Sequence, residues 1–141
     1  MQTFDRPGTI ARGVIVLILI VQLVLGVVFT FAPQAFAHAL GLPPAPAWTD
    51  WMFAQFGARA LGFAYGMRLA LRDPRANAGW LRAMVLVQAI DWLGTLAALF
   101  AGKVTWLQTS TAPFLPVLFV VVLVLELRRQ AVTSAARIEA A

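Results

Sequence analysis

Two residues of opposite charge, Arg59 and Asp91, lie near the middle of two separate apolar stretches of the chain. A charged side chain at the centre of a bilayer costs at least ~2.5 kcal/mol even on the mildest insertion scale, so it needs a partner or a function. An arginine and a carboxylate at one depth can pair with each other, bind a polar molecule or relay a proton. The available chemistry therefore depends on whether these two side chains meet.

Further polar side chains are spaced to share a helix face with one of the two charges, three or four residues away, or to reach the same depth. Together they predict a polar layer of six residues: Arg59, Asp91, Gln22, Gln55, Gln88 and Thr95. The layer could be closed and structural, with an ion pair that fixes helix register. It could instead line a cavity for a polar head group, an anion or a proton relay. The pair of opposite charges favours the structural interpretation.

Catalytic and metal-binding motifs are not found in the sequence. His38 is the only histidine and there is no cysteine, so a haem with two histidine ligands, a thiolate nucleophile and an iron–sulfur cluster are all excluded. No phosphate-binding glycine loop and no Ser/His/Asp set is present. We expect no catalytic residue, no metal and no cofactor, and an enzymatic role is the less favoured one.

Composition places the chain in the membrane, because 61% of its 141 residues are hydrophobic and only 12% are charged. Apolar runs approaching the ~20 residues that an α-helix needs to cross a bilayer predict four spans. These spans cover residues 13–31, 51–71, 79–100 and 113–127. We therefore expect an all-α membrane protein, a single domain over residues 1–141 that folds as an antiparallel bundle of four transmembrane helices.

The connection between the first two spans, residues 32–50, has the signals of a short helix. Pro33 suits a first helical turn and Gly41 suits the position just after a helix. We expect this helix to lie at the outer membrane surface.

The positive charges are distributed asymmetrically about these spans. Apart from Arg59, nine lysines and arginines flank the ends of the spans on the side of both termini, and Lys103 alone lies on the other side. Cytoplasmic loops are enriched in such residues, so both termini are predicted to be cytoplasmic in a multi-pass membrane protein. The net charge of +5 thus reports orientation, and we expect no nucleic-acid partner.

The N-terminus allows one competing interpretation, a cleaved signal peptide. Arg6 and Arg12 precede an apolar run that ends near Ala35-Phe36-Ala37, which resembles a cleavage site. The run is longer than the usual apolar region of about 7–15 residues, so a retained first span is favoured.

Small residues recur every four positions on the second span, at Ala54, Ala58, Gly62, Gly66 and Ala70. Such a stripe lets a neighbouring helix approach closely and is typical of helix packing in lipid. The fourth span carries no polar side chain from Phe114 to Leu125, so we expect it to pack peripherally. Glu126 at its inner end can pair with Arg128, with Arg129 or with the basic connection between the second and third spans.

Several short motifs resemble a known family. Phe31-Ala-Pro33, Phe36, Leu40-Gly41-Leu42 and the segment from Ala58-Arg59 through Gly62 to Gly66 are similar to the small four-helix bacterial membrane proteins called DoxX-like, including their BphX-like relatives. The resemblance covers residues 13–127 in architecture and implies that Arg59 matches an arginine of the family's second helix. Some members are associated with quinone-linked oxidoreductase complexes, which implies a quinone-like ligand or a larger complex as a partner.

Three classes of function follow. An accessory or interaction subunit, or a small binding module, is favoured because the chain combines a helical bundle with no catalytic set. An oligomeric carrier or channel for a small solute or protons is the alternative, with the polar layer between protomers. An enzyme or subunit acting on a lipid-soluble substrate such as a quinone is the third, with Asp91 as proton acceptor. Membrane lipid and a second copy are expected partners in each case.

Overall fold

A computed structural model describes residues 7–139, with side chains to residue 136. Arg6 and the side chain of Arg137, which both enter the count of positive charges, lie outside the described part. Residues 7–139 contain helices and no strands. The helices are α1 (Thr9–Phe31), α2 (Pro33–Ala39), α3 (Thr49–Arg72), α4 (Ala78–Phe100), α5 (Trp106–Thr109) and α6 (Leu115–Glu139). The prediction of an all-α fold is confirmed.

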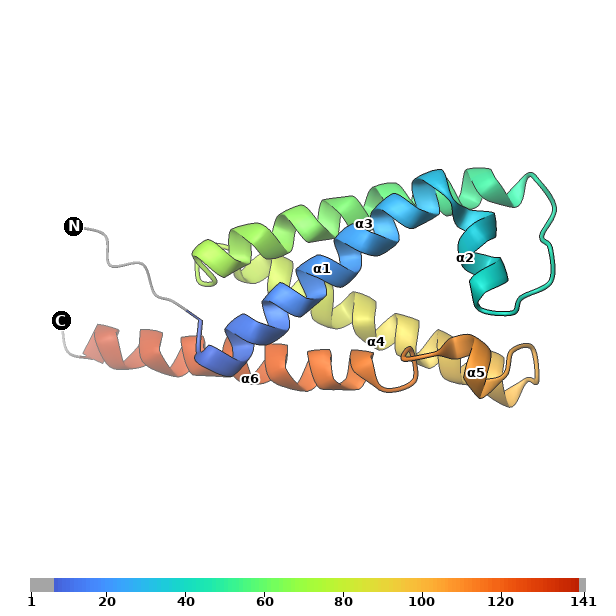
Figure 1. Cartoon of the computed structure of the whole chain (residues 1–141). Helices are drawn as coiled ribbons and strands as arrows, with labels where there is room; N and C mark the ends of the chain where they lie inside the picture. The colour runs from blue at the N-terminus through green and yellow to red at the C-terminus, as the bar shows by residue number, and fades with distance from the viewer. Residues whose placement is uncertain (1–6, 140–141) are drawn as a thin grey trace.

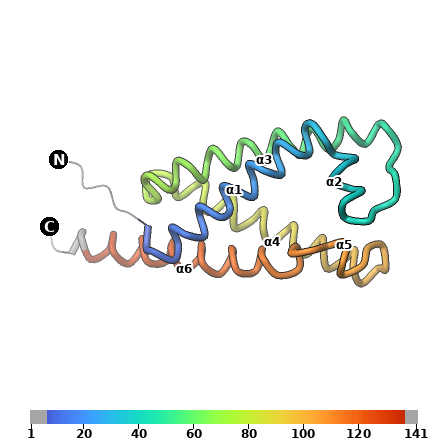
Figure 2. The backbone as a smooth tube through the Cα atoms, in the orientation of Figure 1, coloured from blue at the N-terminus to red at the C-terminus, as the bar shows by residue number. Residues whose placement is uncertain are grey.

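Two of the four long helices, α1 and α4, change their packing partner along their length (Figure 1). α1 begins against α6 and ends against α3, whereas α4 begins against α3 and ends against α6. The closest packing is between α1 and α3 and between α4 and α6. The start of α1, the turn from α3 to α4 and the end of α6 all lie at one end of the molecule, which we call the inner end (Figure 2).

The hydrophobic core lies toward this inner end, where all four long helices meet. Its residues are Val14, Ile15, Ile18, Met67, Ala70, Leu81, Met84, Phe119 and Leu123. Seven of them are completely buried apolar side chains that differ in shape, so α1, α3, α4 and α6 interlock there. Toward the outer end no such core is formed between the α1–α3 pair and the α4–α6 pair in the described chain.

Two helices, α1 and α4, are long and apolar enough to cross a membrane. Both were predicted as spans, and the structure places them as continuous helices of 23 residues. Only 11% of the most apolar part of α4 is buried within the molecule, so most of that helix presents apolar side chains outward. α3 is as long, with 24 residues, but charged side chains, Arg59 and Arg68 among them, make it less apolar than α1 and α4.

The short helix expected after the first span is present as α2. Pro33 occupies its first turn, where the missing N–H costs nothing, and Gly41 follows with a φ of 68° that only glycine adopts readily. Whether α2 rests on a membrane surface stays a prediction.

The fourth long helix differs from expectation in two respects. α6 was predicted to end near residue 127 but continues to Glu139, because glutamine, arginine and alanine are good helix formers and no proline or glycine interrupts them. It was expected to pack peripherally, yet Phe119 and Leu123 are 2% and 0% exposed. A helix without polar groups can still fill a core, because apolar shape alone decides its packing.

Candidate functional site

Two of the predicted polar residues, Gln22 on α1 and Gln88 on α4, are buried, with 7% and 6% of their surface exposed. Both side-chain Nε2 atoms donate to the sulfur of Met84, Gln22 at 4.0 Å and Gln88 at 3.4 Å. A thioether is a weak acceptor, so these contacts orient the amides more than they stabilise the fold. The structure thus brings two members of the predicted layer together at the outer margin of the core.

Arg59 and Asp91 are not brought together. Both side chains are exposed on the surface of the chain, and no ion pair joins them within residues 7–139. Gln55 is exposed as well, and the Thr95 hydroxyl donates to the backbone carbonyl of Asp91 at 2.8 Å rather than to its carboxylate. The expected ion pair is therefore not formed. Of the six residues of the predicted polar layer, only Gln22 and Gln88 are buried.

The two charges nevertheless lie on the sides of α3 and α4 that face each other. Arg59 precedes Gly66 by seven residues, which is two helical turns, and Gly66 packs against Trp80 of α4. Asp91 follows Trp80 by eleven residues, which is about three turns along the same side of α4. Each charge therefore continues outward the helix face that makes the α3–α4 contact nearer the inner end.

The separation of the two charges follows from the divergence of α3 and α4. The rings of Phe63 and Trp80 meet edge to face, with centroids 6.3 Å apart, close to the turn that joins the helices. Beyond this contact α3 is held by α1, while the Trp92 indole N–H donates to the carbonyl of Pro113 at 3.0 Å and holds α4 beside the start of α6. Asp91 and Arg59 lie apart because α4 packs on α6 in this region while α3 packs on α1.

Among the residues that the structure describes, one hydrogen bond links the outer ends of the two helix pairs. Gln108 of α5 donates from Nε2 to the carbonyl of Gly41, which follows α2, at 3.0 Å. Thr105 fixes Gln108 through a capping box, in which each residue bonds to the backbone of the other. The exposed charges therefore lie between a packed core on the inner side and this single link on the outer side.

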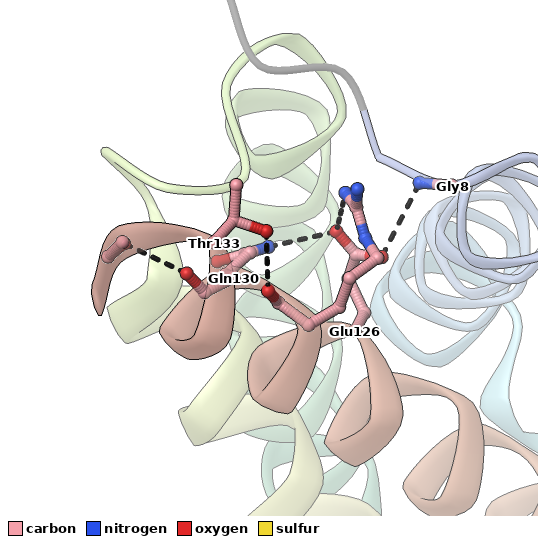
Figure 3. Close-up of polar contacts among 6 residues, drawn as sticks. Gly8, Glu126, Gln130 and Thr133 are labelled. Atoms are coloured by element: carbon pink, nitrogen blue, oxygen red, sulfur yellow. Dashed lines mark hydrogen bonds and ion pairs between the residues drawn. The ribbon is translucent and has the colours of Figure 1, made fainter. Parts of the chain in front are cut away.

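A second polar cluster lies at the inner end, around Glu126 (Figure 3). Its carboxylate is 2% exposed and accepts hydrogen bonds from Arg129 at 2.8 and 3.0 Å, from Gln130 at 3.0 Å and from the backbone N–H of Gly8 at 3.4 Å. The pairing of Glu126 with Arg129 confirms one of the expected partners. Because a carboxylate at a helix N-terminus is stabilising, this cluster ties the start of α1 to α6.

The stripe of small residues on α3 is only partly used in packing. Gly66 lies against the Trp80 indole and Ala70 is buried, but Ala58 and Gly62 are exposed and Ala54 is half-buried. The outer part of the stripe thus lies on a surface that no other helix of the described chain covers.

The closest helix approach involves glycines that the sequence analysis did not single out. A side chain added at Gly57 of α3 would meet Thr30 and the carbonyl of Gly26 on α1, and one added at Gly26 would meet Leu61 at 2.7 Å. The available signal was a second run of small residues, Gly57, Ala60 and Ala64, at helical spacing on α3.

Comparison of the chain with protein-family models, with curated proteins and with solved structures finds no match. The function must therefore be argued from the placement of the charges and from the exposed apolar surface.

Proposed function

We propose that this chain is a small four-span protein of the bacterial inner membrane that serves as an accessory subunit or small binding module. The exposed apolar side chains support a membrane setting. Along α1 they include Ile20, Leu23 and Val24, which are 50%, 47% and 53% exposed, and along α4 Leu86 and Leu93, which are 60% and 59% exposed. In water such surfaces would drive association, whereas lipid covers them without cost.

The observation that carries a binding role is the exposure of Arg59 and Asp91 on facing helix surfaces. In lipid, an uncompensated charge at this depth is costly, and within residues 7–139 neither charge is compensated by an ion pair. A partner that pairs with these side chains would therefore remove the cost of leaving them unpaired in lipid. A polar or charged group that enters between α3 and α4 would satisfy both side chains at once.

The partner would recognise the site by complementary polarity. The Arg59 guanidinium donates to carboxylate, phosphate or carbonyl oxygens, and Asp91 accepts from a donor or a cation. The apolar surfaces of α3 and α4 on either side would contact the non-polar remainder of the partner. A segment of another membrane protein with one polar residue in an apolar helix has this chemistry, as has a second copy of the chain.

The test is co-purification in mild detergent from the native membrane, with proteins and lipids identified by mass spectrometry. We expect Arg59→Gln and Asp91→Asn each to lose the same bound molecule while circular dichroism and size-exclusion profiles stay unchanged. Arg68→Gln is the matched control, because Arg68 is an exposed arginine two and a half turns further along α3 and so on its opposite side. Retention of every bound molecule by both variants would refute the proposal.

The same experiment separates the other classes. Proton or solute flux into liposomes that is lost in Asp91→Asn would identify the oligomeric carrier, and a bound quinone lost in either variant would identify a subunit acting on a lipid-soluble substrate. The DoxX-like resemblance stays a prediction.

A further inference from the structure

A basic pocket of about 220 Å³ lies at the inner end of the molecule, between the start of α1 and the end of α3. It is lined by Arg12 in the first turns of α1, Arg72 at the last position of α3, and the apolar residues Pro7 and Leu71. The pocket is separate from the surface that carries Arg59 and Asp91.

The charge of this pocket is uncompensated within the described chain. The first turn of α1 contains no acidic residue, and a helix N-terminus itself carries partial positive charge. Among residues 7–139 no ion pair joins Arg12 or Arg72 to a carboxylate. Of the acidic groups at this end, Asp73 accepts from the N–H of Ala76 within its own turn, and Glu126 is paired with Arg129.

Two arginines from separate helices that line one pocket suit a phosphate group. Guanidinium–phosphate hydrogen bonds are charge-assisted and have fixed geometry, and a basic pocket between helices on the cytoplasmic side is the common form of an acidic-lipid site. Ile20 and Leu23, both about half exposed, lie on the side of α1 that carries Arg12 and extend outward from the pocket. They provide an apolar track beside the pocket that acyl chains could follow.

We infer that this pocket binds the phosphate of an anionic phospholipid of the inner leaflet, with its acyl chains along α1. The inference rests on the proposed membrane location and does not depend on the binding role of Arg59 and Asp91. The lipid phosphate would bridge Arg12 and Arg72 and so hold the inner ends of α1 and α3 together.

The test measures binding of phosphatidylglycerol, phosphatidylcholine and inorganic phosphate to the purified full chain by native mass spectrometry in detergent. We expect phosphatidylglycerol to bind in preference to phosphatidylcholine. The double variant Arg12→Gln/Arg72→Gln should weaken its binding by about 30-fold, since each arginine near an anionic lipid contributes roughly a five- to sixfold gain. The same lipid should raise the melting temperature of the unsubstituted chain and not that of the double variant.

The matched control is Arg82→Gln/Arg128→Gln, which has the same net charge and removes two exposed arginines outside the pocket. Its affinity should stay within about fivefold of that of the unsubstituted chain. Equal losses in both double variants would show non-specific attraction and overturn the inference. Equal binding of phosphatidylcholine, or displacement of the lipid by inorganic phosphate at similar concentration, would overturn it too. Recovery of the chain outside the membrane fraction would instead refute the proposed location.

Discussion

Gly57 and Gly62 provide a sharp test of the helix packing, because both are glycines within α3 but only one faces α1. A Cβ added at Gly57 would meet Thr30 and lie 2.8 Å from the Gly26 carbonyl oxygen and 2.9 Å from the Thr30 backbone nitrogen. A Cβ added at Gly62 would meet nothing within 4 Å. The same substitution at the two positions therefore differs only in what surrounds it.

The magnitude follows from two opposing terms. Replacing a helical glycine by alanine gains ~1 kcal/mol from helix propensity at either position. At Gly57 the extra methyl group presses on backbone atoms, which cannot move aside as a side chain would, and overpacking of this kind costs about 1–3 kcal/mol. We expect Gly57→Ala to be less stable than the unsubstituted chain by up to ~2 kcal/mol, and Gly62→Ala to be more stable by up to ~1 kcal/mol.

Thermal unfolding in one mild detergent, followed by far-ultraviolet circular dichroism, compares the two variants with the unsubstituted chain. The essential result is their order, with Gly62→Ala melting highest and Gly57→Ala lowest. If Gly57→Ala melted at or above Gly62→Ala, the close crossing of α1 and α3 at Gly26 and Gly57 would be wrong.

Two further substitutions test single contacts. Glu126→Gln removes the charge that accepts from Gly8, Arg129 and Gln130, so we expect the free energy of unfolding to fall by about 1–3 kcal/mol. Amide exchange should accelerate more in the first turn of α1 than in α4. Unchanged exchange in that turn would contradict the cluster as the tie between α1 and α6. Trp92→Phe keeps an aromatic ring but removes the indole donor to the Pro113 carbonyl, so we expect the free energy of unfolding to fall by ~1 kcal/mol, as measured by thermal unfolding. A stability equal to that of the unsubstituted chain would show that the bond does not hold α4 beside α6.

The helices were largely predictable because they depend on local signals. Four apolar runs predicted the long helices, and Pro33 with Gly41 predicted α2. Hydropathy did not predict the extension of α6 beyond residue 127, because helix formation follows backbone propensity and does not stop where polar residues begin. The number of spans that cross a membrane stays a prediction for α3 and α6, since charged residues dilute their apolar stretches.

The candidate site was predictable in its members and not in its arrangement. The sequence identified Arg59 and Asp91 as charges at one depth within apolar stretches, but their positions on the facing sides of α3 and α4 follow from the contact of Gly66 with Trp80. It could not show that α3 and α4 diverge, because that depends on Trp80 filling the space beside Gly66 and on α1 and α6 holding separate helices. Whether two side chains on different helices form a pair depends on the distance between those helices. The spacing of residues along the sequence does not determine that distance.

The sequence by itself determined the all-helical class, the apolar surfaces, the asymmetric positive charge and the presence of two opposite charges within apolar helices. Each of these depends on composition or on local periodicity. Only the tertiary structure decided that Gln22 and Gln88 are buried on Met84 while Arg59 and Asp91 stay exposed, and that Arg12 and Arg72 line one pocket. These relations join residues on different helices, and the way in which α1 and α4 change neighbours along their length fixes which of them meet.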